Sequence, residues 1–209
     1  MKRIYLLLTA ITVVLLLVGV QARQCLTAEK INPLSMEKAN EQQEQALSPA
    51  RKILVVYFSH SGNTRELANQ IHTSVGGDII EIQPEKPYPS NYFALVQRAK
   101  EERDADYKPA LKTKIKNIAS YDVIFIGSPI WGGTIPQPIV SFLSEYDLTG
   151  KTIVPFCTYG GSGQGRSVTD IAKLCPQSTV LEGFGVESKN VKNVQPEIAN
   201  WLNKIKIIE

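Results

Sequence analysis

The sequence predicts an α/β domain in which helices cover both faces of a parallel sheet. Unbroken apolar runs recur along residues 51–209, and each is followed by apolar residues at helical spacing. Unbroken apolar runs indicate strands buried on both faces, because half-exposed strands alternate apolar with polar residues. Strands that alternate with helices are joined by right-handed crossovers, which place helices on both sides of the sheet.

Five strands and five helices are expected. The strands are predicted at residues 53–58, 78–82, 123–127, 152–157 and 179–184. Four helices carry apolar residues at helical spacing: Leu67, Ala68, Ile71 and Val75; Ile139, Phe142, Leu143 and Tyr146; Val168, Ile171, Ala172 and Cys175; and Val194, Ile198, Leu202 and Ile205. The first of these helices is expected to end at Gly76-Gly77.

The remaining helix follows a proline-rich segment, and Ser90 is expected to cap it. One face of this helix carries the following residues: Tyr92, Val96, Ala99 and Arg103. The opposite face carries Lys100, Glu101 and Glu102, which we expect to be a solvated surface.

The first strand runs directly into a polar loop, Ser59-His60-Ser61-Gly62-Asn63-Thr64, which precedes a helix. The first N–H groups of a helix have no intrahelical acceptor, and the helix dipole favours negative charge there. The loop contains no lysine, so it differs from the loop that holds a nucleoside triphosphate with magnesium. It predicts a phosphate monoester site; the alternative is a turn whose hydroxyls only cap the helix.

Two further loops follow the third and fourth predicted strands. The loop after the third strand contains Trp131, which offers a plane for stacking on an aromatic ligand or, alternatively, is a core residue. The loop after the fourth strand runs from Thr158 to Gly165 and is rich in glycine. Its backbone N–H groups are suited to the polar edge of a ring, which Tyr159 would shield unless it is simply exposed.

These three segments resemble the flavodoxin-like family. The family's signatures Y-S-x-S-G-N-T, G-x-P-I-W and T-x-G-G-S-G have counterparts here in the same order, within residues 52–181. The resemblance implies a flavodoxin-like three-layer sandwich with five parallel strands in the order 2-1-3-4-5. It also implies non-covalently bound flavin mononucleotide (FMN) at the carboxyl ends of strands 1 and 3, where open sheets of this kind bind their ligands.

The resemblance also assigns the residues that would bind FMN. The phosphate would be held by Ser59, His60, Ser61, Gly62, Asn63 and Thr64. The ring would be held by Pro129, Ile130, Trp131, Gly132 and Gly133, together with Thr158, Tyr159, Gly160, Gly161, Ser162 and Gly163. Relatives often carry a second aromatic residue where this chain has Gly132, so one face of the flavin is expected to be less covered.

The N-terminal residues predict export. Met1-Lys2-Arg3 is followed by an uncharged apolar run, 4–20, and then by small residues at Val20 and Ala22. This pattern predicts a signal peptide over residues 1–22 or, alternatively, an uncleaved membrane anchor, and places the protein in the cell envelope or outside the cell. Residues 23–50 are polar and aperiodic, which predicts a disordered spacer before a folded domain at 51–209.

The charge of the chain is nearly balanced, with 23 basic and 20 acidic residues. No basic cluster with interleaved aromatic residues is present, so nucleic-acid binding is not expected. Electron-carrier flavodoxins are typically strongly acidic, and this chain departs from them in that respect. The electrostatic docking of their partners is therefore not carried over to this protein.

The cysteines and histidines do not form a metal site or a hydrolytic centre in the sequence. Cys25, Cys157 and Cys175 show no C-x-x-C or Cys/His spacing, which excludes zinc, and we expect the latter two to be buried free thiols. His60 and His72 have no nearby nucleophile with an orienting acid. No catalytic side chain is therefore assigned.

The sequence as a whole favours an exported FMN-binding redox protein. Its partner would be a redox protein or a small electron acceptor. The first alternative is an FMN-dependent NAD(P)H:quinone or nitro-compound reductase, in which the flavin performs the chemistry. The second, from another class, is a non-redox module that binds a phosphorylated ligand.

Overall fold

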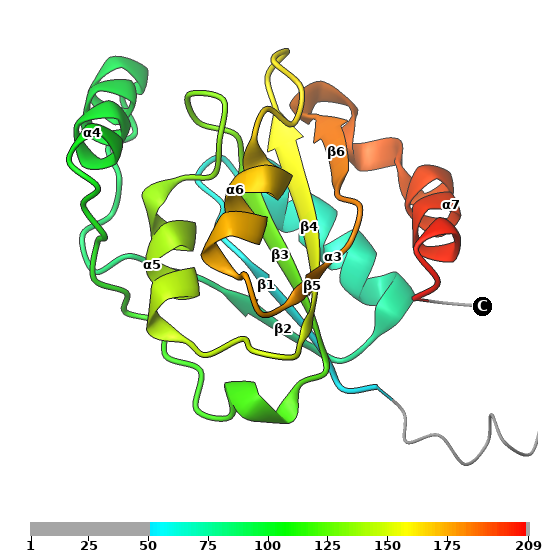
Figure 1. The fold of residues 1–209 in the computed structure, drawn as a ribbon. Helices are drawn as coiled ribbons and strands as arrows, with labels where there is room; N and C mark the ends of the chain where they lie inside the picture. Colours follow the sequence, from blue (N-terminus) through cyan, green and yellow to red (C-terminus); the bar gives the residue numbers. More distant parts are fainter. Residues whose placement is uncertain (1–50, 208–209) are drawn as a thin grey trace, which may run out of the picture. The chain divides into compact units, whose positions relative to one another are not determined.

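The structure, a computed structural model, describes residues 51–207 (Figure 1). The predicted signal peptide or anchor at 1–22, the spacer at 23–50 and Cys25 lie outside the described residues. Within residues 51–207, no helix has the length and apolar character needed to cross a membrane.

A parallel sheet forms the centre of the domain, and its strand order is β2-β1-β3-β4-β5, with β6 also paired to β4. The strands are β1 (Ile53–Tyr57), β2 (Asp78–Glu81), β3 (Val123–Pro129), β4 (Thr152–Tyr159), β5 (Thr179–Val180) and β6 (Phe184–Glu187). The flavodoxin-like order expected from the resemblance is confirmed. β1 and β3 are neighbours, so their carboxyl ends lie side by side. The chain continues from β1 to β2 at one side and from β3 to β4 at the other, which makes this position the switch point of the sheet.

The fifth strand, predicted over residues 179–184, is limited to Thr179–Val180 (β5), and a further strand, β6, begins at Phe184. Residues 181–183 separate β5 from β6, and both pieces pair with β4. The last pair of β4 with β5 is Ile153 with Val180, and the first pair of β4 with β6 is Phe156 with Phe184. Between these pairs, β4 moves on by three residues and the segment opposite it by four. The partner strand therefore carries one extra residue opposite a stretch that contains Pro155, which has no N–H to donate to a ladder.

Alternate residues of the central strands face two separate cores, as expected from the two-residue repeat of a strand. Leu54, Ile124 and Ile153 lie in register and pack into one core. Phe125 and Val154 lie in register one position further along and pack into the other. All five side chains are fully buried, which accounts for the unbroken apolar runs in the sequence.

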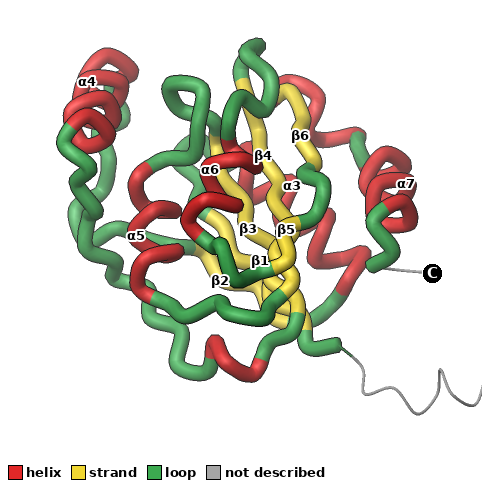
Figure 2. The backbone as a smooth tube through the Cα atoms, viewed as in Figure 1, coloured by secondary structure: helices red, strands yellow, loops and turns green. Residues whose placement is uncertain are grey.

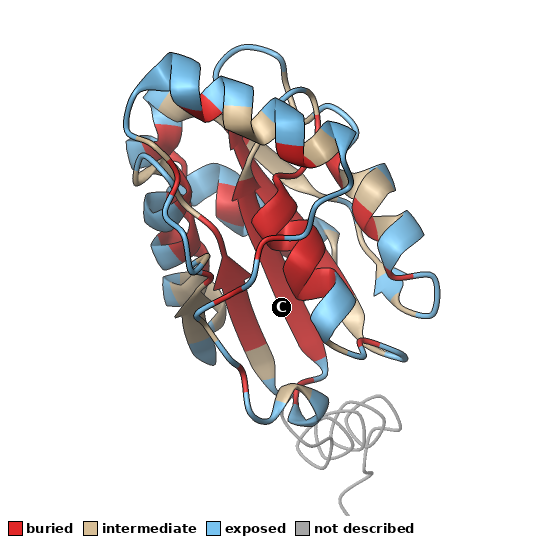
Figure 3. Ribbon diagram, turned by 90° about the vertical axis from the view of Figure 1, so that its left-hand side faces the viewer, coloured by how far each residue is buried: buried red, intermediate tan, exposed pale blue. Residues whose placement is uncertain are grey.

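Two pairs of helices cover these cores (Figures 1 and 2). On one face lie α3 (Asn63–Val75) and α7 (Gln195–Lys204), and on the other lie α5 (Gln137–Glu145) and α6 (Ser167–Leu174). Short 3₁₀ turns occur at η1 (Ile118–Ser120) and η2 (Ser188–Asn193). Figure 3 shows the central strands and the sheet-facing sides of the helices as buried.

The helix α4 (Tyr92–Asp104) stands at a corner of the domain, beside the carboxyl end of the sheet (Figure 1). Asn91, rather than the predicted Ser90, caps it, because the Asn91 side chain accepts a hydrogen bond from Ala94 N at 3.1 Å. The buried residues of α4 are Leu95 and Glu102. The prediction that Glu102 belongs to a solvated face is therefore wrong.

Glu102 is buried because two donors meet its carboxylate: Arg98, one turn earlier in α4, and Tyr88, which precedes the helix. Arg98 Nε donates to Glu102 Oε1 at 2.8 Å, and the Tyr88 hydroxyl donates to Glu102 Oε2. The Arg98 guanidinium also lies 4.2 Å from the centre of the Tyr88 ring and donates to the carbonyl of Pro87. Burial, followed by the contact with Glu102, raises the pKa of Tyr88. This network ties α4 to the proline-rich segment before it.

The cysteines of the described residues, Cys157 and Cys175, are buried free thiols, as expected from their positions in the sequence. Burial raises the pKa of the Cys157 thiol to about 12, and a hydrogen bond with Ser167 partly opposes the shift. Burial also raises the pKa of Cys175. Both thiols are therefore protonated at neutral pH.

Candidate functional site

The loops after β1, β3 and β4 meet at the carboxyl edge of the sheet and border a cleft of about 660 Å³. The sheet side of the cleft is formed by Ser61, Pro129, Ile130, Trp131, Gly132, Thr158, Tyr159, Gly160, Gly161, Ser162 and Ser188. The opposite side is formed by α4, through Tyr92, Leu95, Val96, Ala99, Lys100 and Arg103. The volume lies within the range of about 300–1,000 Å³ typical of small-molecule sites.

The loop between β1 and α3 is shaped by its own hydrogen bonds. Ser59 Oγ accepts from the backbone N–H groups of Gly62 and Arg65, each at 3.2 Å, and Gly62 takes a left-handed φ of 93°. Ser59 thereby satisfies the N–H of the third residue of α3. The N–H groups of Asn63 and Thr64 have no acceptor within the helix, because they belong to its first turn. They are suited to binding an anion.

The three loops are fastened to one another by two hydrogen bonds. The hydroxyls of Thr64 and Thr158 lie 2.9 Å apart, and both side chains are buried. Ile130 N donates to the carbonyl of Thr158 at 2.9 Å. The end of β4 thus contacts both the start of α3, which follows the loop after β1, and the loop after β3 that contains Trp131. These two bonds hold the three loops beside one another at the edge of the cleft.

The loop after β3 turns tightly at Gly132-Gly133, whose φ angles are +59° and +81°. Such a turn needs positive φ at both central residues, which glycine adopts without strain. Trp131 N donates to the carbonyl of Thr134 at 3.0 Å across the turn. The Gly133 carbonyl accepts from Arg166 N at 2.8 Å, which joins this loop to the start of α6.

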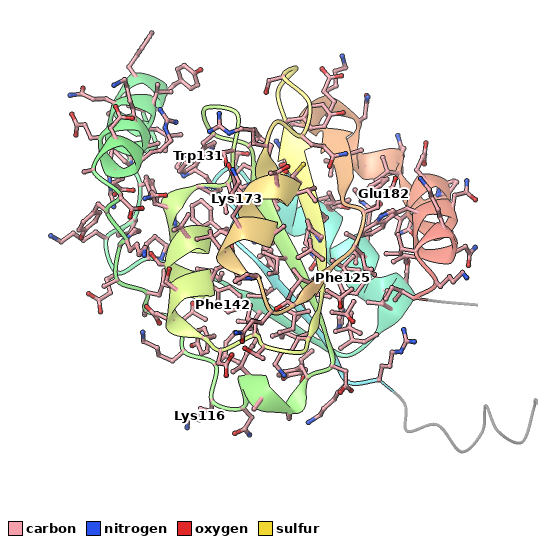
Figure 4. The ribbon with its side chains drawn as sticks, viewed as in Figure 1. Lys116, Phe125, Trp131, Phe142, Lys173 and Glu182 are labelled. Carbon is pink, nitrogen blue, oxygen red and sulfur yellow. The ribbon has the colours of Figure 1, made fainter. Side chains whose placement is uncertain are left out.

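Trp131 borders the cleft and also belongs to an aromatic cluster. Its ring contacts Phe58, Tyr88 and His60 in edge-to-face geometry, with centroid distances of 5.4, 5.0 and 5.9 Å. Figure 4 labels Trp131 at the edge of the sheet beside α4. The two interpretations of this residue, ligand-facing plane and packed aromatic, are therefore compatible, because the cluster fixes the ring at the cleft.

The predicted site residues divide into two groups in the structure. Those that border the cleft are Ser61, Pro129, Ile130, Trp131, Gly132, Thr158, Tyr159, Gly160, Gly161 and Ser162. Those that do not border it are Ser59, His60, Gly62, Asn63, Thr64, Gly133 and Gly163. Ser59 and His60 border a second hollow of about 370 Å³ beside β2, together with Arg65 and Glu81, which form an ion pair at 2.7 Å.

The α4 side of the cleft and Ser188 were not predicted. The stripe of Tyr92, Val96, Ala99 and Arg103 was visible in the sequence, but nothing there showed that it faces a cleft rather than the core. Its one local signal is the scarcity of aliphatic residues on a helix that follows three prolines. Ser188 follows the unpredicted strand β6 and carries no sequence signal.

The charges along the cleft are all positive. Lys100 and Arg103 are its charged residues, and neither Asp nor Glu is among the described residues that line it. Asp104 lies outside the lining and contacts Lys100 Nζ at 2.5 Å and Arg103 Nη2 at 3.7 Å. No group of three or more His, Cys, Asp or Glu side chains suited to a metal ion occurs within residues 51–207.

A comparison with protein-family models decides the family. The model described as flavodoxin matches residues 52–205, which is most of the chain. The chain belongs to the flavodoxin family. None of the curated proteins that were compared matches this family member.

Solved structures agree with this assignment of the flavodoxin-family protein. A protein from Bacteroides eggerthii, provisionally named a flavoprotein, is 37% identical, with 76% of this chain and 99% of that chain covered and a TM-score of 0.68. A protein of the same provisional name from Bacteroides uniformis is 30% identical, with coverages of 74% and 99% and a TM-score of 0.66. The Lactobacillus acidophilus flavoprotein in complex with FMN is 22% identical, with coverages of 73% and 99% and a TM-score of 0.60, and this likeness shows the fold.

The cleft of this flavodoxin-family protein fits FMN, the cofactor of the family. Ser61 borders the cleft, and the first-turn N–H groups of Asn63 and Thr64, which are suited to a phosphate, follow it directly at the amino end of α3. Trp131 and Tyr159 supply aromatic surface for a ring. A Cβ atom at Gly160 or Gly161 would meet nothing within 4 Å, so the backbone of that loop is open to a ligand. The cofactor of the protein is FMN.

Proposed function

We propose that this protein transfers electrons through non-covalently bound FMN. The observation that carries the proposal is the convergence of the loops after β1, β3 and β4 on one cleft at the switch point of the sheet. The family membership and the fold shared with an FMN-bound flavoprotein support the same assignment.

Each loop has a distinct task in this proposal. The amino end of α3 and Ser61 hold the phosphate, because their N–H and O–H groups donate to an anion. Trp131, fixed by Phe58 and Tyr88, and Tyr159 flank the ring and keep water from its faces. Bound FMN supplies a ring system that takes up and gives away electrons, so the protein itself needs no catalytic side chain.

The test is whether the purified protein carries or binds FMN. We expect the full chain to be yellow, or to bind added FMN with a calorimetric signal at one site per chain. A protein that remains colourless and gives no heat with excess FMN would overturn the proposal. Heat with a different phosphate monoester, but none with FMN, would favour a non-redox module that binds a phosphorylated ligand.

A second candidate is an FMN-dependent NAD(P)H:quinone or nitro-compound reductase. The observation that favours it is the extent of the cleft, whose volume of about 660 Å³ is bordered by the side chains of α4 as well as by the three loops, which suits a small acceptor beside the cofactor. Stopped-flow mixing of the FMN-loaded protein with NADPH separates the two functions. Flavin reduction by NADPH that is at least as fast as the steady-state turnover measured with a quinone supports the reductase. No reduction of the flavin by NADPH or NADH supports the carrier.

We also propose that the protein is exported through its N-terminal segment. The positive residues at 1–3 and the apolar run at 4–20 support this proposal. Fractionation of cells that express the full chain, followed by N-terminal sequencing, is the test. Removal of the first 22 residues indicates a signal peptide, and an intact chain in the membrane fraction indicates an anchor. An intact chain in the cytosolic fraction would contradict export.

A further inference from the structure

The side of the cleft formed by α4 has features that the FMN assignment does not use. The FMN ligands expected from the family signatures all come from the three loops at the sheet edge. The α4 side, here named the α4 wall, consists of Tyr92, Leu95, Val96, Ala99, Lys100 and Arg103. These residues lie on one face of α4, because residues three or four positions apart in a helix share a face.

The amino-terminal part of the α4 wall, from Tyr92 to Ala99, is apolar, and two of its residues are open to solvent. The Tyr92 side chain is 69% exposed and Val96 is 46% exposed, although both border a cleft. Ala99 lies one turn further along the same face. Apolar groups gathered on the concave side of a cleft are typical of a binding site, since isolated exposed residues would not converge there. The flat shape of Tyr92 suits a planar aromatic ligand.

The carboxyl-terminal part of the α4 wall, Lys100 and Arg103, is positively charged. Arg103 lies against the Gly132 turn, so closely that a Cβ atom at position 132 would collide with Arg103 Nη1. Lys100 lies about one helical turn before Arg103 in α4 and borders the same side of the cleft. Asp104 balances part of this charge from outside the cleft, but no described lining residue is acidic. A planar guanidinium binds carboxylate and sulfonate groups through two parallel hydrogen bonds.

We propose that the α4 wall is a second ligand site, which binds a planar aromatic compound that carries an anionic group. Tyr92 and Val96 contact the aromatic plane, and Arg103 binds the anion at the Gly132 turn. The inference rests on the proposed function, because the ligand would lie between α4 and the FMN loops. It gives that function a class of small acceptor: aromatic and negatively charged.

The experiment uses the full chain loaded with FMN and three unreactive probes. Naphthalene-2-sulfonate has both the plane and the charge, 2-naphthol has the plane, and methanesulfonate has the charge. Calorimetry measures the Kd of each probe, and a separate titration measures the Kd of FMN. We expect naphthalene-2-sulfonate to bind about tenfold more tightly than 2-naphthol, a difference set by one charged hydrogen-bonded contact, and methanesulfonate to bind weakest.

Three variants assign the effect to the wall. Arg103→Gln is expected to abolish the preference for naphthalene-2-sulfonate over 2-naphthol. Tyr92→Ala is expected to weaken both aromatic probes about fivefold, with a smaller change in the Kd of FMN. Tyr107→Ala is the matched control, because Tyr107 is an exposed aromatic residue (52%) that does not border the cleft. It is expected to leave all three probes unchanged.

The outcomes separate this inference from the proposed function. Failure to load FMN overturns both. Normal loading without binding of naphthalene-2-sulfonate, or a preference that survives Arg103→Gln, overturns the second site alone. A loss of FMN affinity in Tyr92→Ala as large as the loss of probe affinity would show that Tyr92 covers the flavin, and would also overturn the second site.

Discussion

The hydroxyl oxygens of Thr64 and Thr158 lie 2.9 Å apart and join the first turn of α3 to the end of β4. The two residues are 94 positions apart in the chain, and both are almost completely buried. Each belongs to a different family signature, so two motifs separated in the sequence meet through a direct contact. The cleft therefore depends on a polar contact within the core as well as on its surface loops.

This contact predicts a coupling between Thr64 and Thr158. Thr64→Val and Thr158→Val each leave one buried hydroxyl without its partner, which is expected to cost about 1–3 kcal/mol of the free energy of unfolding. The double variant removes both hydroxyls and is expected to lose less than the sum of the single losses. Urea denaturation of the four proteins measures the coupling. Additive losses would show that the two hydroxyls do not depend on one another.

The Gly132 turn predicts a graded series of alanine variants. Gly132→Ala combines a left-handed φ with displacement of the flexible Arg103 guanidinium, whereas Gly133→Ala has the left-handed φ alone. Gly160→Ala has neither and serves as the control. We expect a loss of stability of about 1 kcal/mol at 132 and at 133, from the left-handed φ, and a smaller loss at 160. The Kd of FMN is expected to rise most in Gly132→Ala, and an equal effect at all three positions would contradict the turn geometry.

The tryptophans predict a separation between binding and stability. Trp131 borders the cleft, whereas Trp201 packs against Phe184 and Phe125 on the other side of the sheet. Trp131→Leu is expected to raise the Kd of FMN about fivefold, because stacking is worth roughly 1 kcal/mol. Trp201→Phe is expected to lower the melting temperature with little change in that Kd. Equal changes in the Kd of FMN would exclude a stacking role for Trp131.

The attachment of α4 predicts contrasting effects of two neighbouring glutamates. Glu102→Gln replaces an acceptor of two hydrogen bonds by an amide and is expected to cost about 1.5–3 kcal/mol of the stability of this region. Glu101→Gln is the matched control, since Glu101 is exposed and its contact is with Gln97. Hydrogen exchange of the amides in residues 92–104 measures the difference. Similar protection in both variants would exclude a role for Glu102 in fixing α4.

The raised pKa of Cys157 predicts a loss of stability at alkaline pH. Burial raises this pKa from 9.0 to about 12, so the folded protein holds the proton more tightly than the unfolded chain does. The contribution is complete below pH 9 and is lost as the pH rises toward 12. The free energy of unfolding is expected to fall by up to about 1.4 kcal/mol per pH unit for this group. Cys157→Ala should show a shallower fall in urea titrations, and identical slopes would exclude this assignment.

The central sheet and the three loops could be predicted because their signals are local. An unbroken apolar run predicts a buried strand, and a run of hydroxyls before a helical pattern predicts an anion-binding turn. Trp131 and the glycines of the third loop follow strands that were themselves recognisable. The rule that ligands bind at the carboxyl ends of parallel strands then brings these segments together.

The remaining features depend on contacts between elements, which a local pattern in the sequence does not show. Glu102 is buried because Tyr88, which precedes α4, meets its carboxylate together with Arg98, and no periodicity within α4 reveals the contact with Tyr88. The break between β5 and β6 depends on the register against β4 and on Pro155. The stripe that begins at Tyr92 was visible as a helix face, but its direction is set by the docking of the whole helix.

The sparse attachment of α4 has a consequence for how this protein can diversify. Leu95 and Glu102 are the residues of α4 that the fold buries, and Arg98 holds Glu102, so substitutions at the exposed positions of the helix are expected to leave folding nearly intact. The residues that meet a ligand on this helix are thus free to vary while the sheet and its loops stay the same. Lineages of the family could exchange one acceptor for another by changing a single helical face.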